Sequence, residues 1–150
     1  MNQSKATTRF KSGIKMAKPL DCFERALSTA RTVGNRMLEA AASGNIGVIL
    51  LEMNKDISIA RDHLSAGVDG YRETNYRRSV VFEACLARCE EKLGNWKKAR
   101  NIAIQALKIS QLGYDNDYDG YKAHKETIDE TQRISQLTAD VHGVALPPAC

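Results

Sequence analysis

Apolar residues recur at steps of three and four along most of this chain, which is the spacing of one face of an α-helix. Asp21, with Glu24 three residues later, fits the start of a helix, and Gly44-Asn45 is typical of a helix end. The pattern therefore predicts one helix between Pro19 and Gly44. Its inward face consists of Phe23, Ala26, Leu27, Ala30, Val33, Met37 and Ala41.

The next stretch is apolar on two sides of a helix. One stripe consists of Ile46, Ile49, Leu50, Met53, Ile57, Ala60 and Leu64. Val48 and Leu51 add a second side to the first half. Because helices of this kind are usually sandwiched, we expect Ile46–Met53 to lie at the centre of the fold or at an interface with a second copy of the chain. Gly67 and Gly70 are expected to end this helix.

Three further helices complete the pattern. The third is predicted from about Arg78 to Leu93, the fourth follows the turn Leu93–Trp96, and the fifth lies beyond an acidic loop. Their inward residues are Phe82, Cys85, Leu86, Cys89 and Leu93 in the third, Ala99, Ile102, Ala103, Ala106 and Ile109 in the fourth, and Ile128, Ile134, Leu137 and Val141 in the fifth. Residues Lys97, Lys98, Arg100 and Lys108 are expected to face outward. No stretch alternates long enough for a sheet, so the predicted class is all-α, with about five helices in antiparallel hairpins.

The third and fourth helices carry a family signature. The segment "ACLARCEEKLGNWKKARNIAIQALKIS", within residues 78–112, resembles the tetratricopeptide repeat (TPR), a helix-turn-helix unit. The resemblance rests on Leu86, Ala87, Gly94, Trp96, Ala99 and Ala106. Glu83, Glu90, Ala103 and Gln111 depart from the residues that the family favours at their positions. Gly44-Asn45 and Gly94-Asn95 are fifty residues apart, as are two "DGY" triplets, which favours a degenerate first copy of the hairpin.

The TPR resemblance implies a scaffold that binds a peptide or helix of another protein, and it implies no catalysis. By this fold analogy, the contact surface is expected on the first helix of the recognisable pair. The candidate partner-binding residues there are Arg77, Arg78, Val81, Arg88 and Glu91.

The acidic loop "DNDYDGYKAHKE", residues 115–126, resembles the calcium loop of the EF-hand. Asp115, Asp117 and Asp119 would supply the first carboxylates, Tyr121 a backbone carbonyl, and Glu126 the closing carboxylate. Gly120 would permit the bend. Calcium is the one cofactor that the sequence suggests.

An acidic linker that caps the following helix explains the same residues. Asp119 suits an N-cap and Glu126 an early turn. Lys122 stands where paired EF-hands place an apolar residue, and the chain offers no second loop. Both readings remain open at this point.

Charge divides the 150-residue chain into an arm and a nearly neutral domain. Residues 1–18 hold five basic side chains and no acid, while the other 132 residues hold 17 basic and 18 acidic ones. The basic arm could attract nucleic acid or an acidic partner surface, or be simply solvated. We expect a single α-helical domain over residues 19–143 and a tail over residues 144–150.

The remaining features predict a cytoplasmic protein without catalytic machinery. There is no secretory signal and no apolar run long enough for a membrane span. Cys85 and Cys89 share a helical face and are expected to be buried, reduced thiols. The pairs Glu90-Glu91 and Asp129-Glu130 are expected on solvated faces, and no nucleophile, base and acid constellation stands out.

Overall fold

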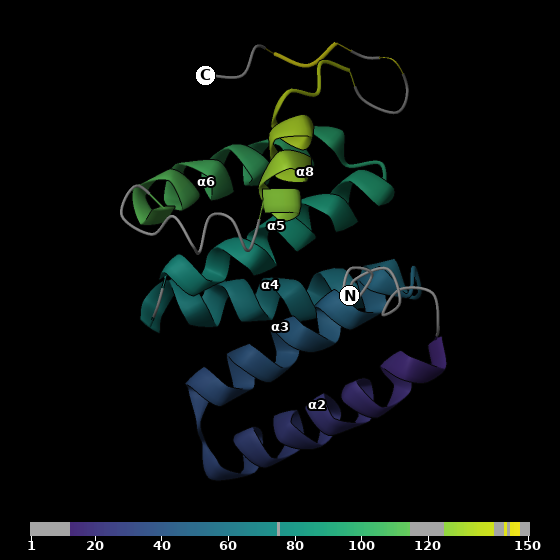
Figure 1. The fold of residues 1–150 in the computed structure, drawn as a ribbon, viewed down its shortest axis with the longest axis vertical. Helices are drawn as coiled ribbons and strands as arrows, with labels where there is room; N and C mark the ends of the chain where they lie inside the picture. The colour runs from purple at the N-terminus through teal and green to yellow at the C-terminus, as the bar shows by residue number, and fades with distance from the viewer. Residues whose placement is uncertain (1–12, 75, 115–124, 140–142, 144, 148–150) are drawn as a thin grey trace.

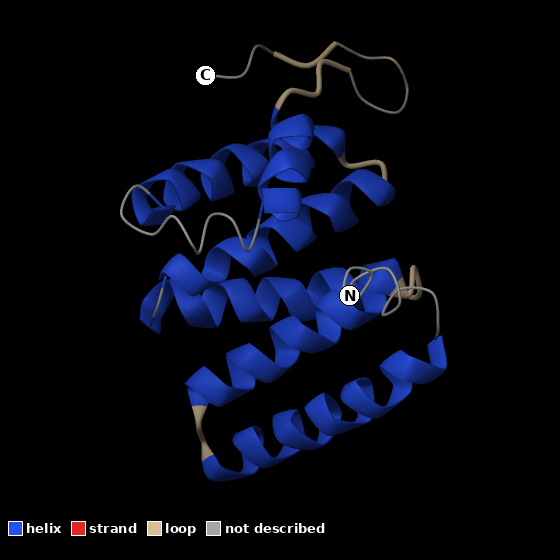
Figure 2. Ribbon diagram, viewed as in Figure 1, coloured by secondary structure: helices blue, strands red, loops and turns tan. Residues whose placement is uncertain are grey.

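The computed structural model describes residues 13–74, 76–114, 125–139, 143 and 145–147. Within these ranges the helices are α2 (Gly13–Val33), α3 (Arg36–Glu52), α4 (Ile57–Thr74), α5 (Tyr76–Lys92), α6 (Trp96–Tyr114) and α8 (Lys125–Ser135) (Figure 1). The same ranges hold no strand, although an isolated antiparallel bridge joins Ala139 to Ala145 (Figure 2). The predicted all-α class is confirmed.

The helices form a stack in the order of the chain. From α2 to α6, each helix packs on its neighbours in the chain, most extensively at the α3–α4 contact, and the short connections make neighbouring helices antiparallel (Figure 1). Helix α8 runs across the outer part of the stack and contacts α5 and α6. The architecture is therefore one of packed helical hairpins.

Three of the connections are built in the same way. After α2, Gly34 takes a left-handed backbone conformation (φ 72°), and the N–H of Asn35 donates to the carbonyl of Ala30 at 2.9 Å. This is the Schellman motif, which satisfies carbonyls left free at a helix end. It recurs at Asn54 (φ 50°) and at Gly94 (φ 82°), so left-handed residues stand 20 and 40 positions apart.

These turns correct two predicted helix boundaries. The helix expected between Pro19 and Gly44 is interrupted at Gly34-Asn35, and Asn35 caps α3 by accepting a hydrogen bond from the N–H of Leu38 at 3.0 Å. Gly44-Asn45 lies inside α3. The fifty-residue similarity is therefore not a structural repeat, because the turn that matches Gly94-Asn95 is sixty residues before it.

The second apolar stretch also divides differently from the prediction. Its helix breaks at Asn54, and α4 continues through Gly67 and Gly70 to Thr74. At the N-terminal side, α2 begins at Gly13, so Pro19 lies within the helix rather than before it.

The glycines in α3 and α4 allow these two helices to approach closely. A Cβ atom on Gly67 would lie 2.8 Å from the Cα of Gly44, and one on Gly44 would overlap the ring of Phe82. A Cβ on Gly47 would lie 2.8 Å from the carbonyl oxygen of Ala60. Glycine is required here by close approach of helix backbones, which is why Gly67 and Gly70 do not act as helix ends.

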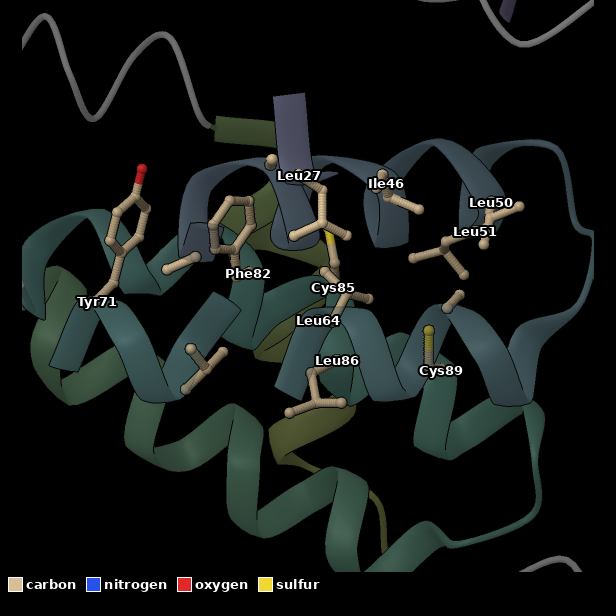
Figure 3. Packing of buried hydrophobic residues seen from close by; sticks show 14 residues of the cluster. Leu27, Ile46, Leu50, Leu51, Leu64, Tyr71, Phe82, Cys85, Leu86 and Cys89 are labelled. Atoms are coloured by element: carbon tan, nitrogen blue, oxygen red, sulfur yellow. The ribbon is translucent and has the colours of Figure 1, made fainter. Parts of the chain in front are cut away.

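The main core lies between α2, α3, α4 and α5. Phe82 of α5 stacks on Tyr71 of α4, with ring centroids 5.3 Å apart and planes at 7° (Figure 3). Ile46, Leu50 and Leu51 of α3 are buried in the same cluster. The central position expected for the two-sided segment is confirmed, and its apolar side chains are covered by the chain itself rather than left for a second copy.

A smaller cluster joins α5 to α6 and α8. It consists of Ala87, Ala99, Ala103 and Ile134, with Ile102 and Leu137 packed against it. Three of its four buried members are alanines, so few apolar atoms hold this part of the stack together.

We predict that Gly67→Ala lowers the free energy of unfolding by about 1–2 kcal/mol. Overpacking of this kind costs about 1–3 kcal/mol, and the better helix propensity of alanine returns up to about 1 kcal/mol. The midpoint of thermal unfolding should fall by roughly 2–8 °C.

A double-mutant comparison separates the two kinds of clash. Phe82→Leu should partly relieve Gly44→Ala, whose new methyl group meets the Phe82 ring, but should do less for Gly67→Ala, whose new methyl group meets backbone. Equal relief in both backgrounds would contradict the close approach of the two backbones.

Candidate functional site

The predicted partner-binding residues all lie on α5, and two of them, Arg88 and Glu91, form ion pairs with other helices of the chain. Arg77 and Arg78 belong to the first turn of the helix, and their side chains lie outside the described part of the structure. Val81 is half-buried. The assignment of these residues to a partner surface stays a prediction.

Arg88 and Glu91 are bound within the chain. Arg88 Nη1 lies 3.4 Å from Glu52 Oε1 of α3. Arg133 of α8 donates two hydrogen bonds to the Glu91 carboxylate, at 2.9 and 2.6 Å, and also binds Glu130 at 2.8 Å. Hydrogen bonding from Arg133 lowers the pKa of Glu130. A partner that used Arg88 or Glu91 would have to compete with these contacts.

Most of the predicted calcium loop cannot be placed against the fold. Asp115, Asp117, Asp119 and Tyr121 lie outside the described residues, and Glu126 is the second residue of α8. Among the residues that the structure describes, no group of three or more His, Cys, Asp or Glu side chains could hold a metal ion. Calcium binding at 115–126 stays a prediction.

The basic arm is only partly described. Gly13–Lys18 form the start of α2, and residues 1–12 lie outside the described ranges, so nucleic-acid binding through residues 1–18 also stays a prediction. None of the described helices has the length and apolarity that a bilayer crossing requires.

Glu90 is a buried carboxylate, not part of a solvated face as the sequence pattern suggested. Its Oε1 accepts a hydrogen bond from Asn95 Nδ2 at 2.9 Å, and its Oε2 lies 3.0 Å from Lys98 Nζ. Its backbone carbonyl accepts from the N–H of Asn95 at 2.8 Å. Glu90 thereby ties the end of α5 to the start of α6, since charges buried in this way require partners.

A second buried carboxylate, Glu83, ties α5 to α4. Its Oε1 accepts from Arg72 Nη2 at 2.8 Å, and Ser79 Oγ donates to its Oε2 at 3.4 Å. Glu83 and Glu90 are seven residues apart and therefore near the same side of α5. The sequence pattern missed them because both are acidic, and only their partners on neighbouring helices make burial favourable.

Arg100 also differs from its prediction. It was expected to face outward, yet it is 4 % exposed, and its Nη1 donates to the carbonyl of Leu137 at 3.0 Å. Beyond Leu137, the N–H of Leu146 donates to the carbonyl of Thr138 at 2.9 Å, next to the Ala139–Ala145 bridge. Arg100 thus fastens the segment after α8 onto α6.

This fastening creates an open cleft at the start of α6, which we call the α6 cleft. Its volume is about 770 Å³. One wall is Gly94–Lys98 with Asn101, and the other is Ala145–Pro147. Apolar and cationic side chains line it together, and none of the described residues in its lining is acidic.

A different surface lies at the other end of the stack. Val33, Met37 and Leu38 flank the turn between α2 and α3, and their exposed fractions are 67 %, 50 % and 40 %. We call these three residues the turn patch. In Figure 1 the α2–α3 connection lies at the lower left and the α5–α6 connection at the upper right, so the turn patch and the α6 cleft are well separated.

The cysteine prediction is confirmed for the two helical residues. Cys85 and Cys89 are buried in the main core (Figure 3). Cys22 is exposed. Burial raises the pKa of Cys85 to about 12 and that of Cys89 to about 11. Thiols of this kind stay protonated and unreactive near neutral pH.

Ser43 and His63 form a polar contact between α3 and α4. His63 Nδ1 lies 3.0 Å from Ser43 Oγ, which also donates to the His63 carbonyl at 3.1 Å. Ser43 is buried, and its hydroxyl contacts His63. Burial, reinforced by the positive charge of Arg31, lowers the pKa of His63.

We predict that thiol reactivity follows this burial. In a Cys150→Ser variant, Ellman's reagent should react rapidly with one thiol, Cys22, and with Cys85 and Cys89 only when the protein unfolds. Three rapid equivalents under native conditions would contradict the burial of the core thiols.

We predict that His63 makes stability fall with pH on the acid side. Its pKa is lower in the folded state than the unfolded value of 6.5, so the unfolded chain takes up the proton first as pH falls. The free energy of unfolding should therefore decrease below about pH 6.5. Urea unfolding from pH 8 to 5 should show a steeper decrease for the wild type than for His63→Gln, and parallel curves would refute the assignment.

No protein-family model, curated protein sequence or solved structure matches this chain. The TPR and EF-hand resemblances therefore rest on the residues that carry them.

Proposed function

We propose that this chain is a non-enzymatic protein-interaction module that binds an amphipathic helix or peptide of a partner protein. The observation that carries the proposal is the turn patch. Among the described residues, Val33, Met37 and Leu38 are three of the five large apolar side chains that are substantially exposed, and they fall within six residues of the chain. The other two are apart from them: Ile59 lies near the start of α4, and Leu93 lies in the connection between α5 and α6.

Exposed apolar surface of this kind is unfavourable unless something covers it. Removing apolar surface from water stabilises a complex by about 25 cal/mol per Å². Single exposed apolar residues need no explanation, but grouped ones are typical of protein contact sites. The grouping at one turn, rather than the exposure of any one residue, supports a docking surface.

The surroundings of the turn patch suit a protein partner. Arg31 and Glu39 form an ion pair at 3.1 Å beside it, and Arg36 is exposed between Val33 and Met37. An apolar centre with a charged rim is the usual anatomy of a protein interface. A partner helix would place its apolar ridge on the patch and an acidic side chain near Arg36.

The polar chemistry of α5 supports a scaffold role in a second way. Glu83, Glu90, Glu91 and Arg88 all bind groups on neighbouring helices. These residues hold the helices in a fixed arrangement, and a preorganised surface loses less entropy on binding.

We predict that a Val33→Glu/Met37→Glu double variant loses partner binding. A photo-crosslinking amino acid at position 38 should label one partner in cells, and calorimetry with that purified partner should show at least a 30-fold weaker complex for the double variant. That loss corresponds to about 2 kcal/mol, the size expected of a central contact.

Ile59→Glu is the matched control, because Ile59 is 51 % exposed near the start of α4 and carries the same type of side chain. Partner binding that weakens equally in the control would refute a role for the turn patch. If light scattering instead finds a dimer that the Val33→Glu/Met37→Glu variant dissociates, the patch joins two copies of this chain and the proposal of a different partner fails.

A further inference from the structure

The α6 cleft differs from the turn patch in chemical character, because its lining combines apolar and positively charged side chains. Trp96, Leu146 and Pro147 supply apolar walls, while Lys97 and Lys98 supply positive charge. Helix α6 as a whole, from Trp96 to Tyr114, contains no acidic residue. A ligand for this cleft has to combine an apolar part with negative charge.

The two lysines are not equivalent. Lys98 is already paired, because its Nζ lies 3.0 Å from the buried Glu90. Lys97 is exposed, and no acidic group of the described residues forms an ion pair with it. The cleft therefore holds one lysine whose charge an anionic group can neutralise.

The start of α6 also has hydrogen-bond donors that find no acceptor among the side chains of the described residues. At the equivalent turn, Asn35 Oδ1 accepts from the N–H of Leu38. Asn95 instead turns its Nδ2 toward Glu90, and no side chain of the described residues accepts from the first N–H groups of α6. Such N–H groups attract anions, because they have no partner within the helix.

Trp96 adds aromatic surface to one wall of the cleft. Its indole Nε1 is shielded from solvent, so this nitrogen does not face the open cleft. The ring of Trp96 therefore offers apolar contact to a ligand, and the polar contacts come from Lys97 and the start of α6.

We propose that the α6 cleft binds an acidic peptide segment in which an apolar residue stands next to aspartate or glutamate. The carboxylate pairs with Lys97 and accepts hydrogen bonds at the start of α6, and the apolar side chain packs between Trp96 and Leu146. The inference rests on the proposed function in one respect, since it assumes that the ligand is part of a protein. It concerns a separate surface, so the two can fail independently.

The test uses the single tryptophan of the chain. Trp96 is the only tryptophan, so its fluorescence reports on the cleft directly. The probes are nine-residue peptides without tryptophan or tyrosine, in which one leucine or phenylalanine is flanked by two, three or four acidic residues. Matched peptides carry glutamine and asparagine in place of the acids, and inorganic phosphate serves as a simple anion.

We expect the acidic peptides to change Trp96 fluorescence saturably, with the neutral peptides at least tenfold weaker. Lys97→Glu should weaken binding at least tenfold, because it replaces attraction by repulsion. Lys108→Glu is the matched control: it makes the same change on the same helix outside the cleft, and it should leave binding within about twofold. Leu146→Ser should weaken the peptides without affecting any response to phosphate.

Three results would overturn the inference. They are the absence of a response to every acidic peptide, equal losses in Lys97→Glu and Lys108→Glu, and binding of phosphate as tight as that of the peptides. The last result would identify a simple anion site. Peptide binding should persist in the Val33→Glu/Met37→Glu variant, so a failure here leaves the turn patch to be decided by its own variants.

Discussion

The close approach of α3 and α4 is the contact on which the rest of the structure depends. Gly44 and Gly67 face each other so closely that a methyl group on either would collide with backbone or with Phe82. The absence of side chains at the crossing makes room for the Phe82 ring, which α5 contributes. This pair of glycines thus sets the distance between α3 and α4, and it also makes the space into which α5 packs its Phe82 ring.

The rest of the stack is held through α5, which is buried on two sides. Different interactions stabilise the two sides. Toward α4 it presents Phe82, Cys85 and Cys89, and apolar burial holds that contact. Toward α6 and α8 the buried apolar residues are mainly alanines, so the polar ties of Glu90 and Arg100 become important. The α6 cleft owes its shape to these polar ties more than to a large core.

The sequence pattern predicted the class and the central helix because both depend on many residues at once. Period-three and period-four spacing runs through most of the chain. The segment Ile46–Met53 is apolar on two sides, so other helices have to cover it on both. Helix ends depend on single residues, and there the pattern failed. Gly34-Asn35 and Gly44-Asn45 are the same dipeptide, yet one is a turn and the other lies in a helix crossing. The difference is a tertiary contact with Phe82 and α4, which local sequence does not contain. The three left-handed residues at helix ends are spaced regularly: Gly34 and Asn54 are twenty residues apart, and Asn54 and Gly94 are forty apart. This spacing is the sequence signal that could have indicated the helix ends.

The candidate surfaces also depend on tertiary contacts that the local sequence does not contain. Arg88 and Glu91 of α5 are predicted as partner contacts by analogy with the TPR, and that assignment stays a prediction. Within the chain, Arg88 binds Glu52 and Glu91 binds Arg133, whereas the turn patch consists of exposed apolar residues. In a stack of helices, charged side chains on an inner helix bind groups on the adjacent helices. Apolar residues beside a turn at the edge of the stack have no adjacent helix to cover them. A surface that can be offered to another protein is therefore to be sought where the stack turns, and both the turn patch and the α6 cleft lie at such turns.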